Sequence, residues 1–149
     1  RRTFFRYYAS KNDAVWGDFD GLLQAMERWL AETPDDRPLM ETLTAAVIRF
    51  NTLSPGAVPA HRQRMALILH VPALQAHSAL RYAAWRAVVA QFAARRLGQP
   101  VESLAPQLLG HLALAAAVTA YEQWLGDGSQ DLSALMATTF AAVQPGGAT

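Results

Sequence analysis

Apolar residues recur every three or four positions along most of this 149-residue chain, which is the period of an amphipathic helix. Proline and glycine interrupt this pattern repeatedly, and a helix is expected to end at each interruption. The pattern predicts six helices: Ser10 to about Glu32, Pro38 to Phe50, Pro59 to His70, Pro72 to Leu97, Glu102 to Leu125, and Asp131 to Val143. Because no alternating strand pattern with hairpin turns occurs, the predicted fold class is all-α.

Composition narrows the class of protein further. With 52% hydrophobic and 17% charged residues, the chain can form one packed core of ordinary domain size. It contains no cysteine, which excludes disulfides, thiolate zinc sites and cysteine nucleophiles. Since the sequence has neither a signal-peptide pattern nor eighteen consecutive apolar residues, we expect a cytoplasmic protein without membrane contact.

The formal net charge of +1 hides a segregated distribution. Residues 1–11 carry four basic side chains, residues 12–41 carry mainly acids, and residues 42–101 carry seven arginines without one acid. Two interpretations remain open. The arginines could pair with the acids of residues 12–41 across the fold, or some of them could contact a phosphate-bearing ligand or DNA.

No pattern in the sequence points to catalysis. The four histidines, His61, His70, His77 and His111, do not form a metal-binding motif, and their pattern favours hydrogen-bonded residues at helix edges. Neither a glycine-rich phosphate loop nor a serine nucleophile elbow is present. The sequence therefore predicts no enzyme, no metal and no cofactor.

The last two predicted helices have more apolar surface than one core can cover. Leu104, Leu108, Leu112 and Ala115 follow one side of the fifth helix, while Leu109, Ala113, Ala116 and Tyr121 follow another. Together with the apolar final helix, this pattern suits a four-helix interface between two chains. The alternative, that the final helix covers the fifth within a monomer, stays open.

The segment RRTFFRYYASKND (residues 1–13) is basic, rich in aromatic residues and followed at once by a helix start. It resembles the end of the DNA-binding domain of TetR-family transcriptional regulators, in which a recognition helix is followed by a turn, a lysine and a long helix. The matching residues are Thr3, Phe5, Tyr7, Tyr8 and Lys11, although phenylalanine is commoner at the position of Tyr8. The segments HRQRM (61–65), YAAWR (82–86) and AYEQWL (120–125) are further similar to the actinobacterial members found with mycofactocin biosynthesis genes.

This resemblance implies a division of the chain and a set of DNA contacts. Residues 1–10 would be the remnant of a helix-turn-helix domain, and residues 11–149 the ligand-binding and dimerisation domain. Arg1, Arg2 and Thr3 would approach bases or phosphates, and Tyr7 and Lys11 would contact phosphates. Because the chain starts at Arg1 rather than methionine, we expect a fragment that binds operator DNA poorly by itself.

The resemblance also implies a repressor that acts as a homodimer and is released by a long-chain acyl-CoA or another amphipathic anion. The expected walls of the ligand site are Phe19, Leu23, Met26, Met65, Leu69, Tyr82, Trp85, Val89, Val118 and Tyr121. Arg62, Arg64 and Arg86 are the candidates for phosphate contacts. The alternatives are a helical lipid-binding or acyl-chain-binding protein without a transcriptional role, or plain core packing of the aromatic residues.

Overall fold

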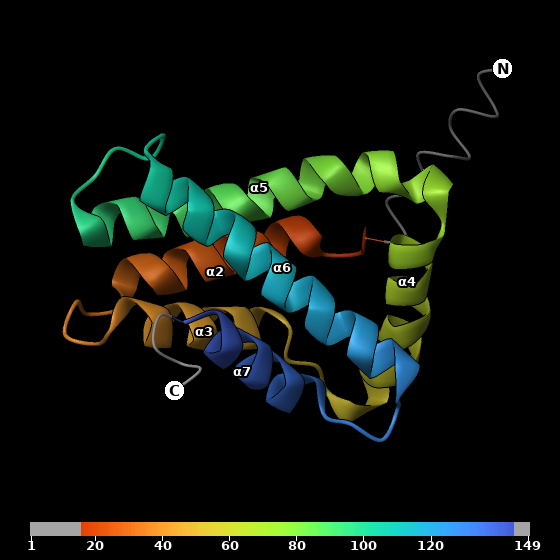
Figure 1. Ribbon diagram of the computed structural model, residues 1–149. Helices are drawn as coiled ribbons and strands as arrows, with labels where there is room; N and C mark the ends of the chain where they lie inside the picture. The colour runs from red at the N-terminus through yellow and green to blue at the C-terminus, as the bar shows by residue number, and fades with distance from the viewer. Residues whose placement is uncertain (1–15, 145–149) are drawn as a thin grey trace, which may run out of the picture.

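The computed structural model describes residues 16–144, and all its regular elements are helical, which confirms the predicted all-α class (Figure 1). The elements are α2 (Phe19–Glu32), α3 (Leu39–Phe50), the short 3-10 helix η1 (Pro55–Ala57), α4 (Val58–His70), α5 (Pro72–Leu97), α6 (Leu104–Gly126) and α7 (Leu132–Val143). From α3 onward, the predicted helices agree with the observed ones to within two residues.

The helices form one bundle around a shared core. The long helices α5 and α6 pack along each other, α7 packs on α6 and α3, and α2 lies between α3 and α5. Helix α4 stands at one end of the bundle, crosswise to α2 and α5, and contacts α5 and α6 (Figure 1). Its transverse position brings the α4 side chains to the ends of several other helices.

The first predicted helix is interrupted, so the expectation of one helix through Glu32 is wrong. Trp16 still has helical geometry, but Gly17 and Asp18 form a turn, and α2 begins at Phe19. Gly17 has a φ of +57°, a left-handed conformation that only glycine adopts without a steric penalty. Within α2, Phe19, Met26 and Leu30 are buried, whereas Leu22 is 45% exposed.

Several helix ends are stabilised by a cap or by a side-chain hydrogen bond. Asp131 caps α7, because its Oδ2 accepts a hydrogen bond of 3.0 Å from the Ala134 amide. Gly98 ends α5 in a left-handed conformation with φ of +64°. The Arg62 guanidinium donates to the carbonyl oxygens of Trp124 and Leu125, at 2.8 and 3.2 Å, and so satisfies acceptors at the C-terminal end of α6.

One side of α6 faces the core and the opposite side does not. Ala113, Ala116 and Ala120 are buried against neighbouring helices, whereas Leu104 is 83% exposed and Leu108 is 50% exposed. By length and composition, α6 could cross a membrane, but a core helix of a soluble protein meets the same criteria. Within the described chain, α7 covers only part of the apolar surface of α6, so the outer leucines remain uncovered.

The arginines of residues 42–101 mostly contact aromatic rings in the described part of the chain. Arg49 lies over Trp29 at 5.3 Å, Arg62 over Trp124 at 4.6 Å, and Arg81 over Trp16 at 5.1 Å. Pairing with the acids of residues 12–41 is seen for Arg96, which lies 3.7 Å from Asp35 and also donates to the Arg37 carbonyl. Among the described residues, cation–π contacts involve more of these arginines than ion pairs do.

Candidate functional site

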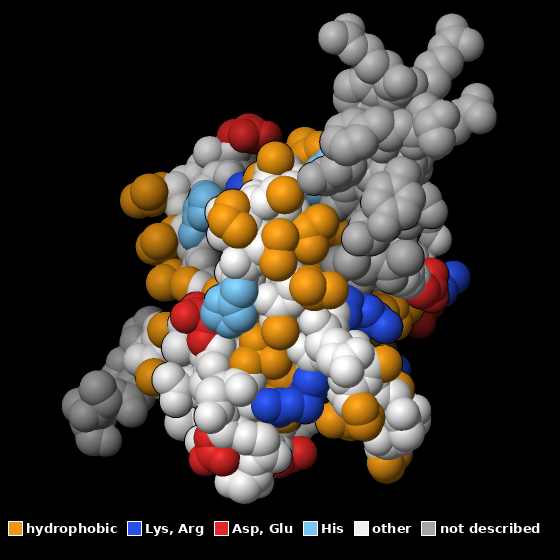
Figure 2. All heavy atoms as spheres, turned by 90° about the vertical axis from the view of Figure 1, so that its right-hand side faces the viewer, with side chains coloured by type: hydrophobic (Ala, Val, Ile, Leu, Met, Phe, Trp, Pro, Cys, Tyr) orange, Lys and Arg blue, Asp and Glu red, His pale blue; other side chains and the backbone are white. Residues whose placement is uncertain are grey.

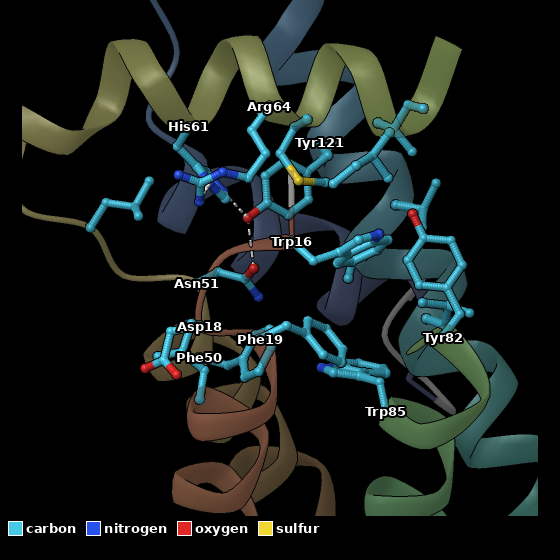
Figure 3. A pocket seen from close by; sticks show the side chains of 18 of the residues that line it. Trp16, Asp18, Phe19, Phe50, Asn51, His61, Arg64, Tyr82, Trp85 and Tyr121 are labelled. Carbon is cyan, nitrogen blue, oxygen red and sulfur yellow. Dashed lines mark hydrogen bonds between the residues drawn. The ribbon is translucent and has the colours of Figure 1, made fainter. Parts of the chain in front are cut away.

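A half-open cavity of about 220 Å³ lies where α4 crosses the ends of α2, α3, α5 and α6 (Figure 3). Its walls are mainly aromatic and aliphatic, and a few polar groups converge on one side. The edge-to-face contacts Trp16–Phe19, Phe19–Phe50 and Phe50–Trp85, with ring centroids 5.2–6.4 Å apart, form a continuous aromatic wall. These features are typical of a small-molecule binding site.

The cavity brings together eight of the thirteen ligand residues expected from the sequence. They are Phe19, Arg64, Met65, Leu69, Tyr82, Trp85, Val118 and Tyr121. These residues come from four different helices, so the fold places side chains near one another that are separated by up to about a hundred residues in sequence.

The other five expected residues lie elsewhere. Met26 and Val89 are buried in the core, and Leu23 packs against that core at the side of α2. Arg62 is engaged with Trp124 and the end of α6. Arg86 lies where α5 meets α6, and its carbonyl oxygen is only 3.0 Å from the position that a Cβ at Gly110 would occupy.

A directed hydrogen-bond chain forms the polar side of the cavity (Figure 3). The Tyr121 hydroxyl donates to Asn51 Oδ1 at 2.7 Å, so it must accept from His61 Nε2, which lies 2.8 Å away. His61 Nδ1 is then an acceptor, and Arg64 Nη1 donates to it at 3.3 Å. The chain thereby ties α4, α6 and the end of α3 together.

This arrangement holds His61 in its neutral form. Burial lowers the pKa of the imidazole from 6.5 to about 4, and the nearby positive charge of Arg64 adds to the effect. Burial also raises the pKa of Tyr121 and of Tyr82, so both phenols stay protonated at neutral pH. The hydrogen-bond chain thus consists of neutral groups beside one arginine, and Asp18 adds a carboxyl group to the cavity lining.

Two polar groups at the cavity lack a partner among the described residues. The indole nitrogen Nε1 of Trp16 and the hydroxyl of Tyr82 are buried and make no hydrogen bond within residues 16–144. Both residues line the cavity, and their rings meet edge to face with centroids 5.9 Å apart.

Trp16, Asp18, Asn51 and His61 line the cavity and were missed as ligand residues from the sequence. Of these four residues, only His61 could have been predicted from its sequence position. It lies three residues before Arg64 and four before Met65, so the three side chains share one face of α4. The expectation that its ring is hydrogen-bonded is confirmed, whereas His70, His77 and His111 are exposed.

The remaining predicted residues concern DNA. Arg1, Arg2, Thr3, Tyr7 and Lys11 lie outside the described residues. Among residues 16–144, no group of three or more histidines, aspartates or glutamates is arranged to hold a metal ion.

Comparison with known proteins gives two matches. The family described as the MftR C-terminal domain, a TetR C-terminal domain, matches residues 37–148. A protein of Mycobacterium tuberculosis strain H37Rv, described as a mycofactocin biosynthesis transcriptional regulator, MftR, is 42% identical over 146 residues. The match covers 98% of this chain and 74% of that relative.

Proposed function

This chain belongs to the TetR family of transcriptional regulators. From this premise we propose that a small-molecule effector controls its binding to operator DNA. The effector would bind in the aromatic cavity described above, here called the α2–α6 cavity because helices α2 to α6 line it. The observation that carries the proposal is the aromatic cavity with its polar side, enclosed by α2, α4, α5 and α6. The family consists of transcription factors rather than enzymes, and the cavity groups suit binding rather than catalysis. Membership of the TetR family also disfavours the alternative of a lipid-binding or acyl-chain-binding protein without a transcriptional role.

We propose a long-chain acyl-CoA or another amphipathic anion as the effector. The apolar walls suit an acyl chain, and Arg64 supplies a cation at the cavity. On the face that carries α4, basic side chains emerge among hydrophobic ones while acidic ones lie toward the margins (Figure 2). Because about 220 Å³ is below the ~300 Å³ of a typical ligand pocket, a long chain would require the helices to move apart.

The break at Gly17 offers a route from the cavity to the DNA-binding end of the chain. Arg64 Nη1 lies 3.8 Å from the position that a Cβ at Gly17 would occupy, and Trp16, Asp18 and Phe19 on either side line the cavity. An effector that displaces Arg64 would therefore push against the turn at Gly17 and Asp18, just before α2 begins. The coupling is reciprocal, since operator DNA would weaken effector binding by the same factor.

We expect Gly17→Ala to lower the free energy of unfolding by about 1–2 kcal/mol, because alanine resists the left-handed conformation found there. Urea denaturation of both proteins measures the difference. Gly56→Ala is the matched control, since a Cβ there meets no atom within 4 Å. Equal stability of the two variants would show that the chain does not need the left-handed turn at Gly17.

We further propose that the protein binds its operator as a homodimer through α6 and α7. The exposed Leu104 and Leu108 on α6 are the apolar surface available for a second copy. A dimer would hold two recognition helices at the ~34 Å spacing of successive major grooves, and a change of helix tilt would disturb that spacing. Such a protein acts where the chromosome lies, so we expect it in the cytoplasm.

A gel shift with the full-length protein and its own promoter tests this function. We expect a retained DNA band without effector and release of the DNA on addition of a long-chain acyl-CoA. Coenzyme A without an acyl chain is the control and should leave the band in place. DNA retention that persists at saturating acyl-CoA would contradict this effector.

A further inference from the structure

Among the described residues that line the cavity, Arg64 is the one with a positive charge, and it extends from α4 beside His61 (Figure 3). Its Nη1 donates to His61 Nδ1 at 3.3 Å, which is long for a hydrogen bond. The same nitrogen lies 3.8 Å from the position that a Cβ at Gly17 would occupy. The guanidinium group is therefore held between α4 and the turn before α2.

The neutral polar groups of the hydrogen-bond chain are already engaged with one another. The Tyr121 hydroxyl accepts from His61 and donates to Asn51, and both ring nitrogens of His61 have a partner. The Asn51 amide nitrogen donates to the Val47 carbonyl oxygen at 2.9 Å. A ligand could bond to most of these atoms only by replacing a hydrogen bond that the protein already has, which offsets the gain.

Arg64 differs from these groups because most of its N–H donors are unused. Its Nε and Nη2 make no hydrogen bond within residues 16–144, and neither is among the buried unpaired atoms, so both are accessible. By contrast, the unpaired Trp16 Nε1 and Tyr82 hydroxyl are buried within the cavity wall. Nε and Nη2 share one edge of the planar guanidinium, and such an edge can bind both oxygens of a carboxylate.

The charges at the cavity favour a ligand with one negative charge over a ligand with two. The charged lining residues are Asp18 and Arg64, which form no ion pair with each other in the described chain. Burial lowers the pKa of His61 to about 4, so the imidazole adds no positive charge at neutral pH. A monoanion can be balanced by Arg64, whereas the second charge of a phosphate ester would meet only the repulsion of Asp18.

We propose that the Nε–Nη2 edge of Arg64 is a carboxylate subsite, which holds a monoanionic carboxylate whose apolar body lies against the aromatic wall. The edge-to-face pair Phe19–Phe50 belongs to that wall. This inference rests on the proposed function, because it names the chemical class of the effector. Among the amphipathic anions proposed above, it selects the ionised form of an apolar carboxylic acid.

Two probes of nearly equal shape test the subsite. 3-Phenylpropanoate carries a carboxylate where 3-phenylpropanamide carries a neutral amide, and calorimetric titration of the full-length protein gives both affinities. We expect the carboxylate to bind about tenfold more tightly at low ionic strength, the value of a charge-assisted pair that stays partly open to solvent. Added salt should reduce the affinity for the carboxylate and leave the affinity for the amide unchanged.

Variants of two arginines on α4 show whether Arg64 is responsible. Arg64→Gln should abolish the preference for the carboxylate, because glutamine can donate a hydrogen bond but carries no charge. Arg64→Lys should keep part of the preference, since lysine retains the charge without the planar edge. Arg62→Gln is the matched control. It should lower the thermal midpoint, because Arg62 bonds the Trp124 and Leu125 carbonyl oxygens, but it should keep the preference.

Each outcome decides the proposal. Equal affinity for the two probes, a preference that survives Arg64→Gln, or no binding of either probe would overturn the subsite. Tighter binding of 2-phenylethyl phosphate than of 3-phenylpropanoate would overturn the assignment to a carboxylate and identify a phosphate site instead. Because operator DNA takes no part in these titrations, the proposed function can fail in the gel shift while the subsite stands, and the reverse also holds.

Discussion

Phe140→Ala is expected to lower the free energy of unfolding by about 3–5 kcal/mol. Phe140 lies on α7, is completely buried, and packs in the core where α7 meets α6 and α3. Removing the ring loses its burial and leaves a void that the neighbouring helices fill only in part. Chemical denaturation at one fixed protein concentration measures the change, since the apparent stability of the proposed dimer would depend on concentration.

An exposed residue provides the control for this experiment. Leu80 on α5 is 72% exposed, and Leu80→Ala should change the free energy of unfolding by no more than about 0.5 kcal/mol. A loss below about 1 kcal/mol for Phe140→Ala would mean that α7 contributes little to the core. The described packing of α7 on α6 and α3 would then be wrong.

Acidification from pH 6.5 to about 4 should destabilise the protein through His61, by roughly 2 kcal/mol. The pKa of His61 falls to about 4 in the folded protein, while an unfolded histidine titrates near 6.5. Between these values the unfolded chain binds the proton and the folded chain does not. The free energy of unfolding therefore decreases as the pH decreases. The expected loss is smaller than the full pKa difference implies, because solvent reaches and screens part of the ring.

Burial of the imidazole is the main physical reason, and the neighbouring Arg64 guanidinium adds to it. Protonation of Nδ1 would turn the acceptor of the Arg64 hydrogen bond into a second positively charged donor. His61→Gln should flatten the dependence of unfolding free energy on pH between 4 and 6.5, whereas the exposed His111→Gln should leave it unchanged. If both variants retain the same slope as the natural protein, His61 is not the group responsible.

Sequence reasoning predicted the helices more accurately than the site. Leu43, Val47, Met136 and Phe140 are fully buried at the positions that helical spacing indicated, because burial of one face determines that spacing. The break at Gly17 escaped prediction because Trp16 and Phe19 keep the three-residue spacing across it. A left-handed conformation at one glycine does not alter the spacing of the apolar residues, so the spacing does not reveal it.

The site depends on contacts between distant parts of the chain. Asn51, His61 and Tyr121 form one hydrogen-bond chain although the two Tyr121 bonds span 60 and 70 residues. Helical periodicity shows which face of α4 or α6 is apolar, but it does not show which residues of different helices meet. Arg86 was expected at the ligand for its charge, yet α5 places it beside Gly110 instead.

The central claim is that effector in the α2–α6 cavity releases operator DNA, and a matched pair of alanine variants tests it most directly. Ala117 is buried on α6 and lines the cavity, so Ala117→Leu should fill part of it and raise the effector concentration needed for release about fivefold or more. Ala87→Leu makes the same change at an exposed position on α5 and should match the natural protein.

The measurement is fluorescence anisotropy of labelled operator DNA, titrated with a long-chain acyl-CoA for each variant of the full-length protein. All three proteins should bind the operator with equal affinity before effector is added, and thermal unfolding confirms that each is folded. The account predicts that only Ala117→Leu resists release. Release of all three proteins at the same effector concentration would contradict it.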